Sequence, residues 1–335
     1  MINKPLVSII MPVYNAGKTL EKSLASLKSQ TYKTLELLLI DDGSTDSSLL
    51  MLNDFKKTVE RLETTIQVRI LSNEENRGVA ATRNQGIKES KGDYIYYVDA
   101  DDWIDEEAIE KMVEAVKLSE WDIIGVNWWL SFEKKEKLMK QPSFDSPKEA
   151  LFLMMTGKMR WNLWLFMVRR DLYIKHDIGF VDGMNMGEDM LVMFKLFAVA
   201  EKVFYLADGV YHYGQSNEES LTKTYSENHR LQVSYNLEKV CSYLLNSAHQ
   251  ELIKRFIGCL KLNIKLPLLM TGDKVDLEIW KNWFPEVNDK YYSRNILPMR
   301  LTCLQWAANN KWMWWLVKLH YVAVVKWYYN ILYKS

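Results

Sequence analysis

The first 130 residues alternate short apolar runs with stretches in which apolar residues recur at helical spacing. The apolar runs have the length and composition of strands, and they are Val7–Val13, Leu35–Ile40, Val68–Leu71, Tyr94–Val98 and Ile123–Trp129. Alternation of this kind predicts βαβ units, and therefore an α/β fold with a mostly parallel sheet covered by helices on both faces. Ligands of such sheets bind beyond the carboxyl ends of the strands.

The pattern continues less regularly after residue 130. Trp161–Val168 is predicted as a strand, and Val203–Leu206 and Val210–Tyr213 as two short strands. Helices are predicted over Gly78–Ser90, Asp105–Leu118 and Glu188–Ala200, and a further helix is predicted to begin at Ser146. Beyond about Asn236 the pattern is helical. We therefore expect an α/β domain over residues 1–235, in two halves at about 6–130 and 131–235, and a helical C-terminal extension over 236–335.

Composition excludes several classes of protein. Lysine plus arginine equals aspartate plus glutamate, at 43 each, so a general nucleic-acid binder is not indicated. The three cysteines, Cys241, Cys259 and Cys303, are far apart and form no metal or disulfide motif, which is typical of a cytoplasmic protein. The N-terminal apolar run is too short for a signal peptide, and no apolar stretch reaches transmembrane length.

Three carboxylates follow the strand predicted over Tyr94–Val98, at Asp99, Asp101 and Asp102. Like charges this close repel one another unless a positive charge lies among them. A divalent cation with a phosphorylated ligand would supply that charge, since Mg²⁺ takes one or two carboxylates plus substrate phosphates. The alternative is a helix cap, because acidic residues favour the first turn of the helix expected from Asp105. The residues by themselves leave both interpretations open.

The segment Asn15–Thr19 ends like a phosphate-binding P-loop. Such a loop needs glycine five positions before Gly17, where this chain has Pro12. Proline offers no N–H to a phosphate, so a P-loop is excluded.

Five short motifs follow one another at the predicted strand ends. They are VSIIMPVYN at 7–15, QTY at 30–32, IDDGSTD at 40–46, NRGVAATRNQG at 76–86 and VDADD at 98–102. Together they resemble the N-terminal half of family 2 glycosyltransferases, enzymes of GT-A fold that use nucleotide-diphospho-sugars. The resemblance runs from about Leu6 to Leu130, with weaker similarity to about Leu221. It implies a GT-A, Rossmann-like domain whose first half binds the nucleotide sugar and whose second half binds the acceptor.

The resemblance gives roles to residues at the strand ends. Asp42 would hold the imide N–H of a uracil-type base, although Asp-Gly-Ser-Thr-Asp is also good turn chemistry. Pro12 and Tyr14 would form a wall of the nucleotide pocket, with a purely structural Tyr14 as the alternative. Arg83, on a helix whose small residues allow a close approach of ligand, would contact the nucleotide or its phosphates. A surface salt bridge is the alternative for Arg83.

In the same way, Asp99, Ala100 and Asp101 fit the family's DXD motif. Asp99 would bind the ribose hydroxyls, and Asp101 would bind the Mn²⁺ or Mg²⁺ ion that bridges the diphosphate. Asp102 would support these groups or cap the following helix. The resemblance does not decide which of the two neighbouring acids, Asp101 or Asp102, contacts the metal.

An inverting sugar transfer also needs a base that takes the proton of the acceptor hydroxyl. The resemblance places this base at the second residue of the pair Glu188-Asp189, at the start of a predicted helix. The alternative is an acidic first turn that favours the helix dipole.

The segment Tyr211-His212-Tyr213 is less typical of the family. Many relatives carry an arginine soon afterwards that grips the diphosphate, but this chain has Gly214-Gln215-Ser216. His212 could contact the diphosphate or the metal instead, although a histidine between two tyrosines is more often structural. Trp161 and Trp164 could stack on an acceptor sugar, or could belong to the core.

The C-terminal tail is basic and rich in tryptophan. From Lys290 to Ser335 there are seven Lys or Arg, five Trp and no Asp or Glu. Residues 306–335 therefore suit a helix on the surface of an anionic membrane, with docking on the catalytic domain as the alternative. The basic positions predicted to share one side of this helix are Lys311, Lys318, Lys326 and Lys334, and the apolar ones elsewhere on it are Trp315, Leu316, Leu319 and Val322.

These observations predict a cytoplasmic, metal-dependent, inverting glycosyltransferase. The donor would be a UDP-sugar, the acceptor a saccharide or a lipid-linked saccharide of bacterial surface polysaccharide synthesis, and the enzyme could be peripheral at the inner face of the plasma membrane. Two alternatives stay open: a non-catalytic nucleotide-binding or membrane-scaffold relative, and a nucleotidyltransferase. The latter needs a glycine-rich, basic loop after the first strand, which Pro12–Asn15 does not provide.

Overall fold

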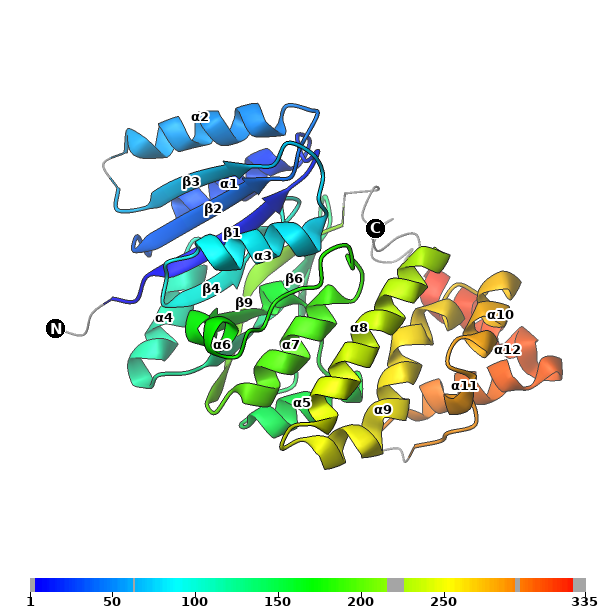
Figure 1. The fold of residues 1–335 in the computed structure, drawn as a ribbon. Coiled ribbons are helices and arrows are strands. Elements are labelled where there is room, and N and C mark those ends of the chain that lie inside the picture. The colour runs from blue at the N-terminus through cyan, green and yellow to red at the C-terminus, as the bar shows by residue number, and fades with distance from the viewer. Residues whose placement is uncertain (1–3, 63, 216–225, 293–295, 328–335) are drawn as a thin grey trace. The chain divides into compact units, whose positions relative to one another are not determined.

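The computed structural model describes residues 4–62, 64–215, 226–292 and 296–327 (Figure 1). Contacts divide the chain into two compact units. The first comprises residues 1–150 with 160–248, and the second comprises residues 151–159 with 249–335.

Nine strands of the described residues form one sheet in the first unit, in the order β3-β2-β1-β4-β8-β6-β9-β5, with β7 paired to β6. In chain order the strands are β1 (Val7–Val13), β2 (Leu35–Asp41), β3 (Gln67–Ser72), β4 (Tyr94–Tyr97), β5 (Trp103–Ile104), β6 (Ile123–Ser131), β7 (Glu136–Met139), β8 (Phe166–Arg169) and β9 (Val203–Gly214).

The four strands from the first 97 residues, β1 to β4, are all parallel, as the strand–helix alternation predicts. Every residue of β2 and β4 is buried, which is typical of parallel strands with helices on both faces. Parallel pairing places the carboxyl ends of β1, β2 and β4 at the same edge of the sheet. The edge contains Asp41, the last residue of β2, opposite Val13 of β1.

Antiparallel pairs enter where β8 joins β4 and β6, and where β5 and β7 join β9 and β6. The expected strand at Trp161–Val168 is shorter than predicted. Leu163–Leu165 forms a 3₁₀ turn, in which Leu165 N–H donates to Asn162 O at 3.1 Å, and only β8 is extended. The two strands expected near 203–213 are one strand, β9, which passes Gly209 through an irregular register against β6.

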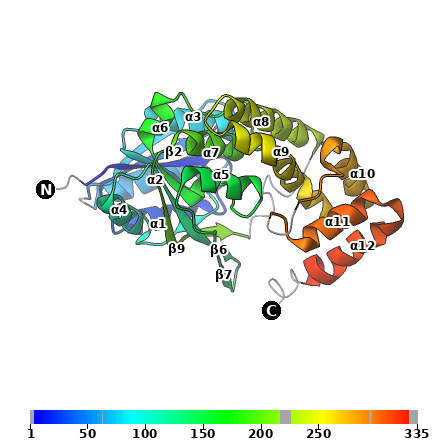
Figure 2. The same cartoon turned by 90° about the horizontal axis from the view of Figure 1, so that it is seen from below.

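Helices cover both faces of this sheet. Figure 2 shows α3, α6 and α7 on one face and α1 and α4 on the other. The predicted helix at Asp105–Leu118 begins later, at Ala108, because Trp103 and Ile104 first pair with β9. The helices that lie wholly in the first unit are α1 (Leu20–Ser29), α2 (Ser48–Glu60), α3 (Val79–Glu89), α4 (Ala108–Leu118), α6 (Arg170–Lys175), α7 (Glu188–Val199) and α8 (Glu227–Leu245).

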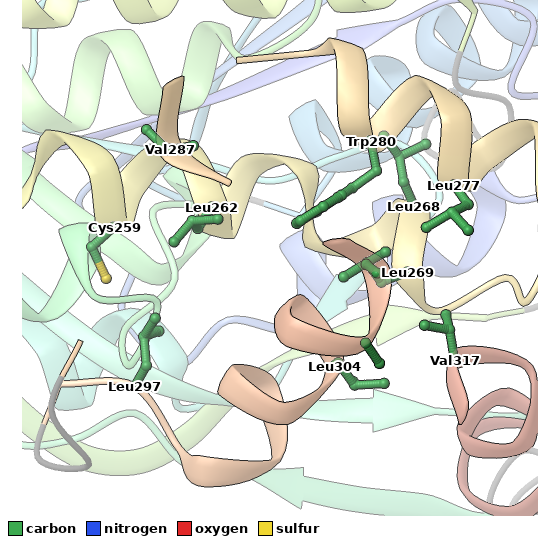
Figure 3. Packing of buried hydrophobic residues seen from close by; sticks show 12 residues of the cluster. Cys259, Leu262, Leu268, Leu269, Leu277, Trp280, Val287, Leu297, Leu304 and Val317 are labelled. Atoms are coloured by element: carbon green, nitrogen blue, oxygen red, sulfur yellow. The ribbon is translucent and has the colours of Figure 1, made fainter. Parts of the chain in front are cut away.

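The second unit is helical in its described residues. Its core contains Leu262, Leu269, Trp280, Leu304 and Val317, which come from successive elements and pack together (Figure 3). The α-helices from residue 249 onward are α9 (Gln250–Lys265), α10 (Lys274–Asn282), α11 (Met299–Asn309) and α12 (Trp314–His320), and α5 (Pro147–Met155) enters this unit at Leu151.

Lys265 is a buried cation in this second unit. Its Nζ donates to the carbonyl oxygens of Trp280, Trp283 and Phe284 at 2.9–3.2 Å and to Oδ1 of Asn288. The ammonium group therefore satisfies carbonyls at and beyond the end of α10, which have no partner within the helix.

Within the described ranges, none of the helices combines the length and the apolar character that crossing a bilayer requires.

Candidate functional site

Asp42 organises the edge of the sheet at the end of β2. Its carboxylate accepts hydrogen bonds from the side chain of Asn73 at 2.7 Å and from the backbone N–H groups of Arg77 and Gly78 at 3.1 and 2.8 Å. Only 3% of Asp42 is exposed. These partners lie 31 to 36 positions further along the chain, so the carboxylate fixes the segment before α3 to the end of β2.

The close contact between the start of α3 and Asn185 explains why a glycine is needed at position 78. Gly78 has a φ of +86°, and a Cβ there would lie 2.4 Å from the side chain of Asn185. Asn185 in turn accepts a hydrogen bond from Ala80 N–H at 3.0 Å. The segment before α7 is thus fixed to the first turn of α3, and Asn84 strengthens this link through bonds to Phe180.

Arg83, one turn into α3, is the centre of a buried charge cluster. Its Nη1 donates to Oε1 of Glu188 and to Oδ1 of Asp189, each at 2.8 Å. Its Nη2 donates to Oδ1 of Asp99 at 3.2 Å. The residue is 4% exposed, so the alternative of a surface salt bridge is wrong. One guanidinium therefore connects the strand-end carboxylate Asp99 with the acidic pair at the start of α7.

Burial sets the protonation of this cluster. Burial alone would lower the pKa of Arg83, but the charges of Asp189, Asp99 and Glu188 raise it above its ordinary value. Burial and the neighbouring charge of Asp189 raise the pKa of Glu188 to about 8. Burial also raises the pKa of Asp189, although Arg83 opposes the shift. The acidic pair, which titrates together, thus keeps a proton near neutral pH.

The three acids after β4 differ in their surroundings. Asp102 is fully buried, and it accepts hydrogen bonds from the hydroxyl of Tyr211 and from Gly214 N–H, each at 2.7 Å. Burial, followed by the charges of Asp101 and Asp99, raises the pKa of Asp102. Asp102 lies six residues before α4, whose N-cap is Glu107, so the helix-cap interpretation is wrong. Its carboxylate instead holds β9 against the loop Asp99–Asp102.

Asp99 and Asp101 remain partly accessible, whereas Ala100 between them is buried. No cluster of three or more His, Cys, Asp or Glu with metal-binding geometry occurs among the residues that the structure describes. The partly accessible carboxylate of Asp101 nevertheless fits a hard cation that takes further oxygen ligands from a diphosphate. The donor set is therefore compatible with Mn²⁺ or Mg²⁺.

Pro12 and Tyr14 lie where β1 ends. Pro12 pairs with Ile40 of β2 inside the sheet, and Tyr14, just beyond the strand, is 49% exposed. Tyr14 is thus a large, half-exposed ring at the same edge of the sheet as Asp42.

His212 is not brought to the other predicted site residues. Its Nε2 lies 2.8 Å from Asp105, its Nδ1 lies 3.0 Å from Glu136, and its ring is stacked between Trp103 and Trp129. Both ring nitrogens and both ring faces are occupied. The side chain therefore has a structural role between neighbouring strands and does not belong to the site.

Gly214 has a structural reason. A Cβ at this position would lie 2.7 Å from the backbone oxygen of Asp101, so the loop Asp99–Asp102 leaves no room for a side chain at position 214. Trp164 is buried and stacks on Tyr211 and Tyr213 at 4.4 and 5.6 Å, so it belongs to the core. Trp161 is half-buried against Phe194 of α7.

Two contributors to the site were not predicted. Tyr211 binds Asp102 and accepts a hydrogen bond from Asp99 N–H at 3.2 Å. Leu163 N–H donates to Oδ2 of Asp189 at 3.3 Å. Neighbouring residues of a strand point to opposite faces of the sheet, so Tyr211 and His212 cannot share one environment. This alternation was the signal in the sequence that could have identified Tyr211. A backbone donor such as Leu163 leaves no signal in a side-chain pattern.

Comparison with known proteins agrees with this geometry. Residues 8–191 match the family model described as "Glycosyl transferase family 2". The uncharacterized glycosyltransferase EpsJ of Bacillus subtilis is 29% identical over 227 residues, which cover 65% of this chain and 63% of that protein. The putative glycosyltransferase EpsH of the same organism is 31% identical over 219 residues, or 62% and 60% of the two chains. The chain thus matches somewhat less than two thirds of these relatives' length.

Solved structures share the fold. TarS from S. aureus in complex with UDP-GlcNAc matches with a TM-score of 0.68 at 19% identity, over 95% of this chain and 91% of that one. The mannosyltransferase PcManGT from Pyrobaculum calidifontis, in complex with GDP-Man and Mn²⁺, matches with a TM-score of 0.55 at 15% identity, over 100% and 89%. The expected GT-A fold with a helical C-terminal region is confirmed.

Proposed function

The chain belongs to glycosyl transferase family 2, and from this premise we propose that it transfers a sugar from a UDP-sugar to an acceptor hydroxyl with inversion at the anomeric carbon. The acceptor would be a saccharide or a lipid-linked saccharide in bacterial surface polysaccharide synthesis. The observation that carries the proposal is the position of Arg83 between Asp99 and Asp189. It links a carboxylate suited to the donor with one suited to the acceptor.

Asp189 would act as the base. The acceptor oxygen would attack the anomeric carbon from the face opposite the leaving group, and the bond from that carbon to the diphosphate oxygen would break. The hydroxyl proton would pass to Asp189, whose raised pKa favours its capture. The backbone N–H of Leu163 orients the carboxylate, and protonated Glu188 avoids a second negative charge beside it.

The donor would lie along the edge formed by β1, β2 and β4. We propose that Asp42 binds the base, that Tyr14 and Pro12 wall the pocket, and that Asp99 binds the ribose. Ala100 keeps the loop small, and Arg83 would supply positive charge on the phosphate side.

Asp101 would hold Mn²⁺ or Mg²⁺, with Asp102 behind it as a fixed support. Such an ion acts as a Lewis acid that stabilises negative charge on the departing diphosphate. PcManGT was solved with Mn²⁺, which supports the choice of ion.

The place of action we propose is the cytoplasm, at the inner face of the plasma membrane if the acceptor is lipid-linked. No nucleic acid is expected as a partner.

The test combines binding and turnover. UDP-sugars, with and without Mn²⁺, are screened by thermal shift, and the best donor is used for calorimetry and transfer assays. Asp189→Asn should keep donor affinity and lose transfer, and Asp101→Ala should lose the Mn²⁺-dependent part of donor affinity. Asp145→Asn, at an exposed acid outside the site, is the control and should change neither. An active Asp189→Asn variant would place the base elsewhere.

The absence of an arginine near Gly214 favours one alternative, a nucleotide-binding relative without transfer activity. In that case the donor panel gives binding, but neither hydrolysis nor transfer is detected with any acceptor. Release of pyrophosphate from a nucleoside triphosphate and a sugar phosphate would instead indicate a nucleotidyltransferase.

A further inference from the structure

Large apolar side chains at the end of the described chain face solvent. Trp312 is 92% exposed and Trp327 is 62% exposed. A water-facing tryptophan is unusual, and several together mark an interaction surface. We call the following set the docking face: Trp306, Trp312, Trp315, Leu319, Val322 and Trp327.

Two members of the docking face lie on one side of α12. Trp315 and Leu319 are four positions apart in this helix, the spacing of neighbours on one side of an α-helix. Trp312 lies just before α12 in the 3₁₀ turn Lys311–Met313, and Val322 lies just after it in the π-helical turn Tyr321–Lys326.

The opposite side of this segment is occupied by the core of the second unit. Val317 is buried among Leu304 and its neighbours (Figure 3), and Trp314 and Leu316 pack against the same cluster. The sequence placed Leu316 with Trp315, Leu319 and Val322, away from the lysines, whereas the structure packs Leu316 against the core. The helix is therefore anchored on one side and leaves its other side without a covering element in the described residues.

Charge decides what kind of partner fits. Exposed bases lie beside the docking face at Arg300, Lys318 and Lys326, and the chain has no acidic residue from Lys290 to Ser335. A second copy of this chain would bring like charges together, which opposes self-association through the face. Tryptophan rings flanked by lysines instead match a bilayer interface, where rings lie at the headgroups and ammonium groups meet lipid phosphates.

We propose that the docking face binds the surface of an anionic membrane. The tryptophan and aliphatic side chains enter the headgroup region, and the lysines provide the preference for negatively charged lipid. Lys311 and Val325, whose side chains are not described, and Lys334, which lies outside the described residues, play no part in the definition of the face.

The test is co-sedimentation of the full chain with vesicles of phosphatidylcholine alone or mixed with phosphatidylglycerol. We expect binding to the mixed vesicles that weakens at high salt, and little binding to phosphatidylcholine. Trp312→Ser combined with Trp315→Ser should lower the partition coefficient about tenfold. Lys318→Gln should lower it about fivefold on mixed vesicles.

The matched control is Leu50→Ser combined with Leu231→Ser. These leucines, 64% and 65% exposed, belong to the first unit, so binding should stay as in the wild type. Thermal unfolding checks that all variants are folded.

Three outcomes would overturn the proposal: no sedimentation of the wild type, equal binding to both kinds of vesicle, or unchanged binding of the tryptophan variant. A concentration-dependent dimer that the tryptophan variant loses, without vesicle binding by the wild type, would make the face a self-interface. Asp189→Asn should sediment like the wild type, so failure of the transfer mechanism and failure of lipid binding are separate results.

Discussion

Replacement of Arg83 by methionine tests whether one guanidinium controls the charge of the site. Arg83→Met keeps an unbranched side chain but leaves Asp99, Glu188 and Asp189 without their shared cation. Removing one partner of a buried ion pair destabilises a protein by about 3–5 kcal/mol. We expect Arg83→Met to lower the free energy of unfolding by an amount in this range at pH 8.

The loss should be smaller at acidic pH, and the sign follows from linkage. In the wild type the pKa of Glu188 is about 8, above its ordinary value. A carboxyl group with a raised pKa favours folding below its unfolded pKa and loses that contribution as the pH rises through its folded pKa. Arg83 lowers the pKa of both Glu188 and Asp189, so its removal raises them further. The stability of the variant should therefore fall more steeply between pH 5.5 and 8.

The assay is urea unfolding of wild type and Arg83→Met at pH 5.5 and pH 8. Donor affinity and transfer are measured on the same proteins, and both should be lost or greatly reduced in the variant. The matched control is Arg69→Met, which breaks pairs with Glu36 and Glu89 outside the site and should lose stability but keep transfer. If the destabilisation by Arg83→Met is the same at both pH values within about 1 kcal/mol, the carboxylates do not depend on Arg83, and the reasoning is refuted.

Three more substitutions test other parts of the structure. Glu188→Gln removes a carboxyl group with a pKa near 8, so urea unfolding at pH 7 should show a gain of at most about 3 kcal/mol, and no gain at pH 4. Burial lowers the pKa of Lys265 to about 8, so the wild type should gain stability as the pH rises from 8 to 10, and Lys265→Met should remove that gain in the same assay. Gly214→Ala forces a Cβ against the backbone of Asp101, and we expect a loss of about 1–3 kcal/mol with weaker donor binding by calorimetry, whereas Gly183→Ala, which has open space but a positive φ, should lower stability without affecting donor binding.

The sequence by itself determined the α/β class, the parallel first strands, the family and the edge of the sheet where the acids lie. These features depend on local information, because strand and helix periodicity and turn residues are set by neighbours in the chain. The burial of Tyr94–Tyr97 follows from the same pattern, and β2 extends one residue beyond its predicted end at Ile40.

Only the tertiary structure decided how the charged groups meet. Arg83, Asp99 and Asp189 are separated by up to 106 residues, and no periodicity shows that they share one buried contact. The role of Asp102 as an anchor for Tyr211 and Gly214, and the enclosure of His212 between two indoles, likewise depend on the pairing of β5 with β9.

The burial of residues in the C-terminal tail also could not be predicted from the sequence. The charge and tryptophan content of the tail were visible in the sequence, but the burial of Val317 and the exposure of Trp312 and Trp315 were not. Burial depends on what another segment covers, and that is decided only when distant parts of the chain pack together.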